Sequence, residues 1–171
     1  MTLKVKDNFL KKDIFNNLHE RMMSSFFPWY WNNGVNYGTG EGEPDSSFQF
    51  THTFFKDDAI NSNDFEILNP FIEKLKIKKL IRIKANLLTK HHEIYEHGLH
   101  IDSHVKNAKT AIFYLNDNDG YTKFETGKIV KSKSNRLVEF DACIKHTGST
   151  VTNKKRRVVI NFNYVNSSFH Q

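Results

Sequence analysis

The sequence predicts an α+β fold that is mainly β, in which helices near the N-terminus brace one sheet of a two-sheet barrel. Two stretches of the first half carry apolar residues at helical spacing, whereas most segments after residue 100 have the pattern of strands, with clusters of Asn, Asp, Gly and Ser between them. Because 171 residues suffice for one domain with a real core, we expect a single domain over 1–171. Residues 1–78 would supply helical support and the first strands, and residues 79–165 the core of the barrel.

The first half of the chain contains both predicted helices. One is expected from about residue 8 to 23, with apolar residues near one face. Pro28 and the glycines between residues 34 and 42 predict an irregular segment after it. A strand is expected over 48–55, and a second amphipathic helix over 64–76.

Two longer strands are predicted further along the chain. The strand over 79–88 would place three residues on one side, namely Leu80, Arg82 and Lys84. The strand over 156–164 alternates throughout. One of its faces carries Arg157, Val159, Asn161 and Asn163, and the other carries Val158, Ile160, Phe162 and Tyr164.

Three residues of the second half have the composition of an iron site. Two imidazoles and one carboxylate on one face of Fe(II) leave the opposite positions open, which is the ligand set of non-haem iron oxygenases. His100 and Asp102 stand two residues apart, so on a strand they would project from the same side. His146 lies beside a Gly turn ahead of the last strand, and the guanidinium of Arg157 could bind a carboxylate bidentately.

The second half of the chain resembles the Fe(II)- and 2-oxoglutarate-dependent dioxygenases, in their prolyl 4-hydroxylase-like branch. The resemblance covers residues 80–164. It rests on four segments in the expected order: Gly98–Asp102, Ala111–Asn116, Asn135–Phe140, and His146–Gly148 leading to Arg157–Phe162. It implies a double-stranded β-helix, the jelly-roll or cupin-like barrel of that family.

The resemblance also implies roles for individual residues. His100, Asp102 and His146 would bind Fe(II). Arg157 would bind the distal carboxylate of the cosubstrate 2-oxoglutarate, and Tyr114 would hydrogen-bond the same carboxylate.

Three further residues have open roles near this site. Arg156 competes with its neighbour for the carboxylate, but it would lie on the opposite face of the strand, so we prefer Arg157. Asn86 and Asn161 could line the pocket, either as cosubstrate contacts or as structural bridges, because buried amides need partners.

The activity implied is hydroxylation of a substrate with consumption of O2 and release of succinate and CO2. A prolyl residue in a peptide is the first candidate substrate, and free amino acids and small metabolites are alternatives. Asp102 fills the position that halogenating relatives leave for chloride, which favours hydroxylation. Three upstream segments resemble a subgroup of small oxygenases encoded by marine bacteriophages: Phe27–Trp31, Phe50–Phe54 and Arg82–Leu87.

Two other functions stay open at this point. One is a non-catalytic β-barrel module with a structural or storage metal. The other is a dioxygenase acting on alkylated nucleic acid, which the net charge of +6 suggests. The basic stretches at 74–79 and 154–157 are more simply solvated surface, and the repair branch of the family has a second arginine six residues after its clamp, where this chain has Asn163.

Composition also bears on location. Within the sequence no apolar run approaches the length of a membrane span, and the N-terminal residues lack the apolar core of a signal peptide. The single cysteine, Cys143, cannot form an internal disulfide. We therefore expect a cytoplasmic protein, in the host cytoplasm if a phage encodes it, with no membrane partner.

The remaining histidines and the cysteine have simpler interpretations than catalysis. His91, His92 and His97 are expected in a loop, and this segment, 89–98, could act as a lid, as could 32–47.

Residues closer to the proposed ligands need separate interpretation. His104 forms a second pair with Asp102 and would edge the pocket, and His52 is more simply structural. Cys143 is expected as a small buried side chain on a strand.

Overall fold

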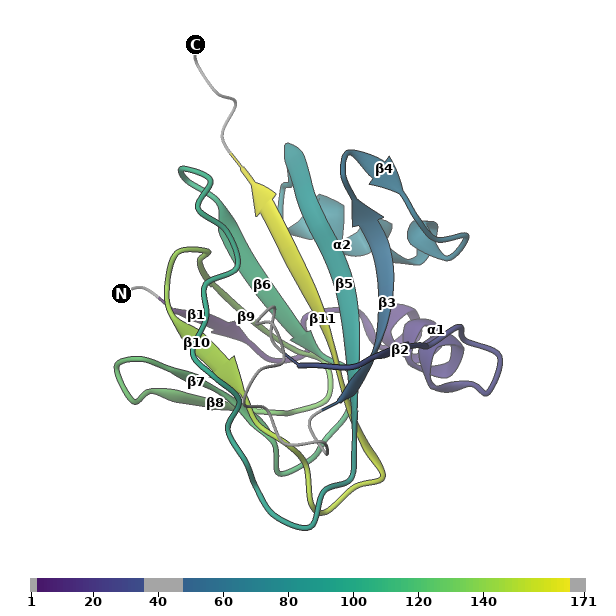
Figure 1. Cartoon of the computed structure of the whole chain (residues 1–171). Coiled ribbons are helices and arrows are strands. Elements are labelled where there is room, and N and C mark those ends of the chain that lie inside the picture. The colour runs from purple at the N-terminus through teal and green to yellow at the C-terminus, as the bar shows by residue number, and fades with distance from the viewer. Residues whose placement is uncertain (1–2, 36–47, 167–171) are drawn as a thin grey trace.

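Two antiparallel sheets dominate the computed structural model, which describes residues 3–35 and 48–166. The larger sheet has the order β1-β9-β6-β11-β5-β3-β2, with β4 paired to β3 (Figure 1). Its strands are β1 (Lys4–Lys6), β2 (Tyr30–Asn32), β3 (Gln49–Lys56), β4 (Ala59–Ile60), β5 (Lys79–Thr89), β6 (Lys109–Tyr114), β9 (Arg136–Asp141) and β11 (Arg156–Val165). The smaller sheet, β10-β7-β8, comprises β7 (Tyr121–Phe124), β8 (Ile129–Lys131) and β10 (His146–Gly148).

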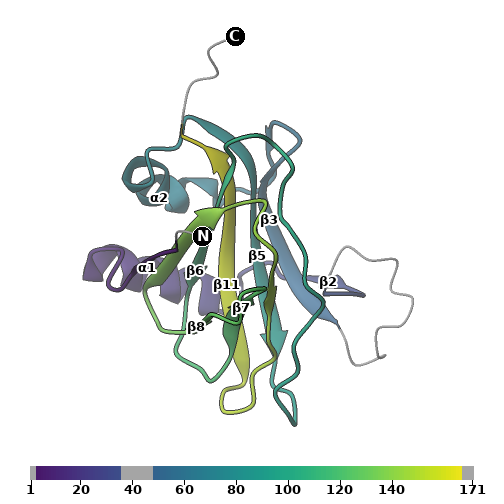
Figure 2. The same cartoon turned by 90° about the vertical axis from the view of Figure 1, so that its left-hand side faces the viewer.

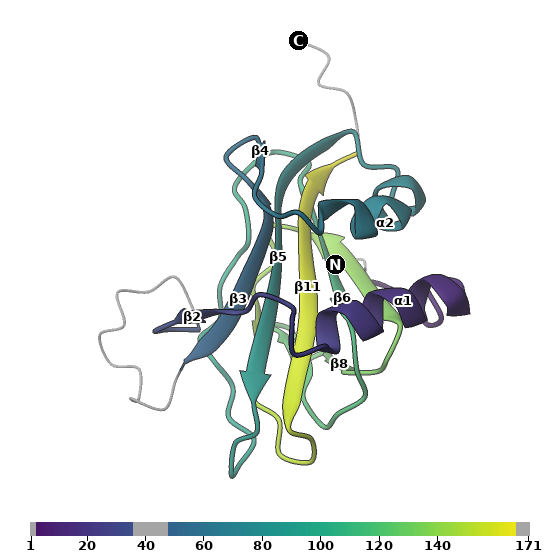
Figure 3. The same cartoon turned by 90° about the vertical axis from the view of Figure 1, so that its right-hand side faces the viewer.

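Two short α-helices cover one face of the larger sheet. They are α1 (Lys12–Met23) and α2 (Asn69–Lys74), which a 3-10 helix (Phe65–Leu68) precedes. Figures 2 and 3 show both helices on the same side of the sheet. The predicted class, mainly β with helices bracing one sheet, is confirmed. No helix among residues 3–35 and 48–166 is long and apolar enough to cross a membrane.

The main hydrophobic core lies between the helices and the larger sheet. Phe71 of α2 is fully buried, and its ring centroid lies 4.7 to 5.6 Å from those of Phe9, Phe113 and Phe162. The second strand face predicted for β11, from Val158 to Tyr164, belongs to this core. A smaller core between the two sheets includes Ile112, Tyr114 and Val159 of the larger sheet.

The first helix begins four residues later than the sequence predicts. Asn8 has a φ of 52°, in the left-handed region, and this turns the chain out of a helical path. Phe9 and Leu10 then bind Asn135: the backbone N–H of Phe9 donates to the Asn135 carbonyl and that of Leu10 to its side-chain oxygen, both at 2.9 Å. Their backbone groups are therefore occupied by a tertiary contact before the helix starts.

The second predicted helix is split in two. Pro70 lies in the first turn of α2, where its missing N–H costs nothing because that position has no hydrogen-bond partner within the helix. The proline ring also prevents an α-helix that starts earlier from continuing through this position. The 3-10 helix before it and the left-handed Lys76 after it bound a helix of only six residues.

The predicted face of the strand at β5 is wrong at Leu80. The register shifts by one residue beside the Asn163–Tyr164 step, where Arg82 pairs with Asn163 but Leu80 pairs with Tyr164. This bulge turns Leu80 toward the main core, whereas Arg82 and Lys84 face the opposite side.

The prediction that Cys143 is a buried side chain on a strand is also wrong. It is exposed in the turn between β9 and β10, and the neighbouring Ala142 takes the buried position. Burial at one position of a tight turn leaves the next position facing solvent, which a strand pattern cannot anticipate.

Candidate metal centre

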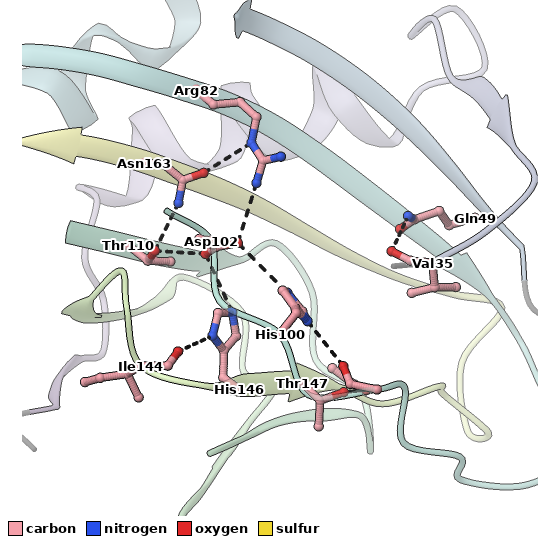
Figure 4. Close-up of polar contacts among 12 residues, drawn as sticks. Val35, Gln49, Arg82, His100, Asp102, Thr110, Ile144, His146, Thr147 and Asn163 are labelled. Carbon is pink, nitrogen blue, oxygen red and sulfur yellow. Dashed lines mark hydrogen bonds and ion pairs between the residues drawn. The ribbon is translucent and has the colours of Figure 1, made fainter. Parts of the chain in front are cut away.

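His100, Asp102 and His146 converge on one point between the two sheets. Each offers a ligand atom, and these atoms all lie within 4.8 Å of one another. His146 belongs to β10, which pairs with β7. Figure 4 shows the two imidazoles and the carboxylate turned toward each other.

The expectation that one strand carries His100 and Asp102 is wrong. His100 forms an isolated antiparallel bridge with His146, closed by two N–H···O bonds of 3.0 Å. Asp102 lies in a bend, and its N–H donates to the carbonyl of Ala142 at 3.1 Å. The backbone contacts of His100 with His146 and of Asp102 with Ala142 bring the two side chains to the same side. Alternation along one strand does not.

The histidine rings present the same nitrogen to the centre. Nδ1 of His146 lies 2.9 Å from the carbonyl of Ile144, and Nδ1 of His100 lies 3.3 Å from that of Gly98. If each Nδ1 donates to its carbonyl, each Nε2 carries the lone pair, and these Nε2 atoms lie 3.6 and 3.9 Å from oxygens of Asp102. Burial lowers the pKa of His146, which favours the neutral imidazole that a metal requires.

Asp102 is an ionised carboxylate in a buried position. Burial alone would raise its pKa, but the hydrogen bond from Thr110 and the positive charge of Arg82 act against burial, and the pKa is held below its usual value. The site therefore offers two imidazoles and one anionic oxygen ligand, the set that suits Fe(II).

Arg157 is a buried cation at another part of the same cavity, with 4% of its surface exposed. Its Nε donates to Ser132 Oγ at 3.1 Å and its Nη2 to the carbonyl of Tyr121 at 3.2 Å. Within residues 3–35 and 48–166, no carboxylate forms an ion pair with it, and burial lowers its pKa. A buried guanidinium that contacts only neutral acceptors is suited to an incoming anion.

The turn before β7 makes room for this arginine. A Cβ on Gly120 would lie 2.6 Å from Cδ of Arg157, so only glycine allows the side chain its present path.

The competing Arg156 is excluded from the pocket. Its Nη2 donates to the carbonyl of Met23 at 2.9 Å, at the end of α1 and on the other face of β11. The predicted alternation of the two arginines is confirmed.

Tyr114 lies beside Arg157, but it is not on the pocket wall. Its ring centroid is 5.9 Å from the guanidinium carbon, it is fully buried, and its hydroxyl donates to Thr122 Oγ1 at 2.7 Å. Thr122, which the sequence reasoning missed, lines the pocket in its place. Its position in β7 carried no signal beyond strand alternation.

The cavity that joins the metal centre to Arg157 has a volume of about 490 Å³. Asn86 and Asn161 both line it, as expected, and the buried Oδ1 atom of each has no hydrogen-bond partner among the described residues. Lys84, paired with Asn161 across the strands, also faces the cavity. The alternation of β5 contained this signal, because Lys84 lies on the face of Arg82 and Asn86.

The other histidines differ in how far their side chains are buried. His92 is exposed in the loop, as expected, but His97 is buried and lines the cavity, where Thr147 Oγ1 donates to its carbonyl. His104 is exposed and lies outside the ligand cluster. His52 contacts the Pro28 carbonyl and Ser62 Oγ, each at 2.7 Å, which supports a structural role.

The two segments expected as possible lids differ in how much of each the structure describes. Residues 89–98 follow the cavity wall through His97, and most of 32–47 lies outside the described residues.

Comparison with known proteins adds evidence on the fold. No family model matches the chain, and no curated protein matches it. Among solved structures, the non-heme alpha-ketoglutarate-dependent epimerase SnoN from nogalamycin biosynthesis is 12% identical with a TM-score of 0.67, over 95% of this chain and 77% of that one.

Two prolyl hydroxylases are also similar. One from Trichoplax adhaerens, in complex with a peptide fragment of hypoxia inducible factor, is 14% identical with a TM-score of 0.65, over 96% of this chain and 83% of that one. A prolyl-4-hydroxylase from Pseudomonas putida is 11% identical with a TM-score of 0.59, over 95% and 92%. These similarities, together with the sheet topology, show that the chain has the double-stranded β-helix fold seen in 2-oxoglutarate- and Fe(II)-dependent oxygenases.

Proposed function

We propose that this protein is an Fe(II)- and 2-oxoglutarate-dependent oxygenase that hydroxylates its substrate. The observation that carries the proposal is one cavity with two complementary sites. At one, His100, Asp102 and His146 offer an iron ligand set, and at the other Arg157 is buried without a carboxylate partner among the described residues.

The residues present fit both groups. Two imidazoles and one carboxylate would hold Fe(II) and leave positions for the cosubstrate and O2. When bound, the iron would supply the activation of O2, coupled to decarboxylation of 2-oxoglutarate to succinate and CO2, with one oxygen atom transferred to a C–H bond of the substrate. The protein supplies the binding and orientation.

Arg157 would bind the distal carboxylate of 2-oxoglutarate through charge-assisted hydrogen bonds. Tyr114, which we expected in direct contact with that carboxylate, supports this end by donating to Thr122 on the cavity wall. Asn86 and Asn161 could donate their amide N–H groups to the cosubstrate. Ile112 and Val159 give the cavity an apolar wall that excludes water.

A peptide is the first substrate to test, because a structurally similar prolyl hydroxylase is solved in complex with a peptide fragment. Asp102 as the third ligand favours hydroxylation over halogenation. The similarity to phage oxygenases stays a prediction.

The test measures succinate formation by purified protein with Fe(II), 2-oxoglutarate and O2. We expect turnover in the wild type, uncoupled from substrate if none is supplied, and its loss in His100→Ala and Arg157→Ala. His104→Ala is the matched control, because His104 is exposed and lies outside the cluster.

Two results would contradict the proposal. A wild type that binds neither metal nor 2-oxoglutarate would remove the enzyme assignment. A wild type that retains metal but consumes no cosubstrate would instead support a non-catalytic metal-binding barrel.

A further inference from the structure

We infer that Arg82, Thr110 and Asn163 are positioning residues that hold Asp102 ready for the metal. This inference rests on the proposed metal centre and adds residues from three adjacent strands to it. The three side chains form a row across the larger sheet: Asn163 of β11 pairs with Arg82 of β5 on one side and with Thr110 of β6 on the other. We call this set the carboxylate-holding row.

The hydrogen bonds of the row run in one direction. Arg82 Nε donates to Asn163 Oδ1 at 3.2 Å, and Asn163 Nδ2 donates to Thr110 Oγ1 at 3.0 Å. Thr110 Oγ1 then donates to Asp102 Oδ2 at 2.8 Å. Figure 4 shows this chain of contacts ending on the carboxylate.

A second contact closes the row into a ring. Arg82 Nη2 lies 3.5 Å from Asp102 Oδ1, the oxygen that does not receive the Thr110 hydroxyl. Thr110 and Asn163 are almost fully buried, and the Asp102 side chain is 3% exposed. Each oxygen of this nearly buried carboxylate therefore has its own partner, which fixes the plane of the group.

The backbone explains why an arginine reaches this position. The bulge in β5 lies immediately before Arg82, which makes Arg82 the first residue of the regular alternation that faces the cavity. Bulges beside functional sites commonly redirect a side chain in this way. The same irregularity that returns Leu80 to the core directs Arg82 to Asp102.

Asp102 needs such support because its own backbone does not provide it. The residue lies in a bend, anchored by one backbone hydrogen bond to Ala142. The torsion that rotates a carboxylate plane is broad, so without the row the oxygens would be poorly oriented. Partners behind a metal ligand fix its orientation, and their loss typically weakens metal affinity by about 10- to 100-fold.

Charge and orientation predict opposite effects for Arg82. A cation beside a metal repels it, so if charge alone mattered, removing Arg82 would strengthen metal binding. If positioning dominates, as we infer, removing it weakens binding. Lys84 provides the comparison, because it contributes the same charge from the next cavity-facing position of β5 and is outside the row.

The experiment titrates the purified full chain with Co(II), whose visible spectrum reports coordination geometry as well as affinity. We expect Thr110→Val and Arg82→Met each to weaken Co(II) binding by about 10-fold or more and to alter the spectrum. Thr110→Ser, which keeps the hydroxyl, should restore both. Lys84→Met should bind Co(II) at least as tightly as the wild type.

The outcomes separate this inference from the proposed function. If wild type binds Co(II) and the folded Thr110→Val variant binds it equally with an unchanged spectrum, the inference fails and the metal centre stands. If Lys84→Met weakens binding as much as Arg82→Met, the weakening does not depend on contact with Asp102 and the row is refuted. If wild type binds no Co(II), both proposals fail. Should Arg82→Met not fold, the Val and Ser variants of Thr110 still decide the question.

Discussion

Replacement of Arg157 by methionine tests the cosubstrate site and the cost of its buried charge together. Methionine has a similar length and removes the charge. For 2-oxoglutarate binding, losing one partner of a buried, hydrogen-bonded charge pair costs about 2–5 kcal/mol. At about 1.4 kcal/mol per tenfold, this predicts a dissociation constant raised by about 30-fold to several thousand-fold.

The stability of the ligand-free protein should respond very differently. Arg157 has no carboxylate partner among the described residues, so its removal recovers a desolvation penalty of several kcal/mol. The variant also loses two hydrogen bonds from a charged donor, at about 1.5–3 kcal/mol each. These terms nearly cancel, and we expect the free energy of unfolding to change by less than about 2 kcal/mol, or a Tm shift within about 8 °C.

The assay is calorimetric titration of 2-oxoglutarate into the protein loaded anaerobically with Fe(II), alongside urea unfolding of the ligand-free form. Arg156→Met is the matched control, because it removes the same charge from the neighbouring position on the opposite face of β11. The reasoning is refuted if Arg157→Met binds 2-oxoglutarate within about threefold of wild type, or if Arg156→Met weakens binding as much.

Three further results are expected. Gly120→Ala should displace the Arg157 side chain, because the new Cβ would lie 2.6 Å from Cδ of Arg157. The same titration should show weaker 2-oxoglutarate binding in this variant, while metal binding persists. Gly148→Ala, whose new Cβ would lie 3.6 Å from Nη1 of Arg157, should have a smaller effect. Basic partners lower the pKa of Asp7, so its contribution is present above the unfolded pKa near 4 and is lost as pH falls through the lower folded value. Because these ion pairs are partly exposed, Asp7→Asn should cost only about 0.5–1 kcal/mol at pH 7 and less than that at pH 2, and an equal loss at both pH values in urea unfolding would contradict this. Phe71→Ala should lower the free energy of unfolding by about 3–5 kcal/mol, and a loss under 1 kcal/mol would show that the ring is not central to the core.

Features set by local chemistry could be predicted from the sequence alone. The alternation of β11 separated Arg157 from Arg156 correctly, because successive side chains of any strand point to opposite faces. The ligand types at His100, Asp102 and His146 indicated a metal site, because their donor atoms suit Fe(II) whatever surrounds them. The mainly β class followed from the same period of two.

Features that depend on which segments become neighbours were decided by the tertiary structure. His100 and Asp102 face one centre through a bridge to β10 and a bend, where sequence reasoning expected a strand. The bulge that turns Leu80 inward and Arg82 toward Asp102 appears only in the pairing of β5 with β11.

The partners and the burial of individual side chains were also decided by the tertiary structure. Tyr114 lies beside Arg157, yet its hydroxyl donates to Thr122. Cys143 is exposed because its turn buries the residue before it. The alternation of side chains along a strand is a property of its own backbone, so it can be predicted from the sequence. The partners that each side chain meets depend on register between distant segments, where a shift of one residue reverses the outcome, so only the folded chain determines them.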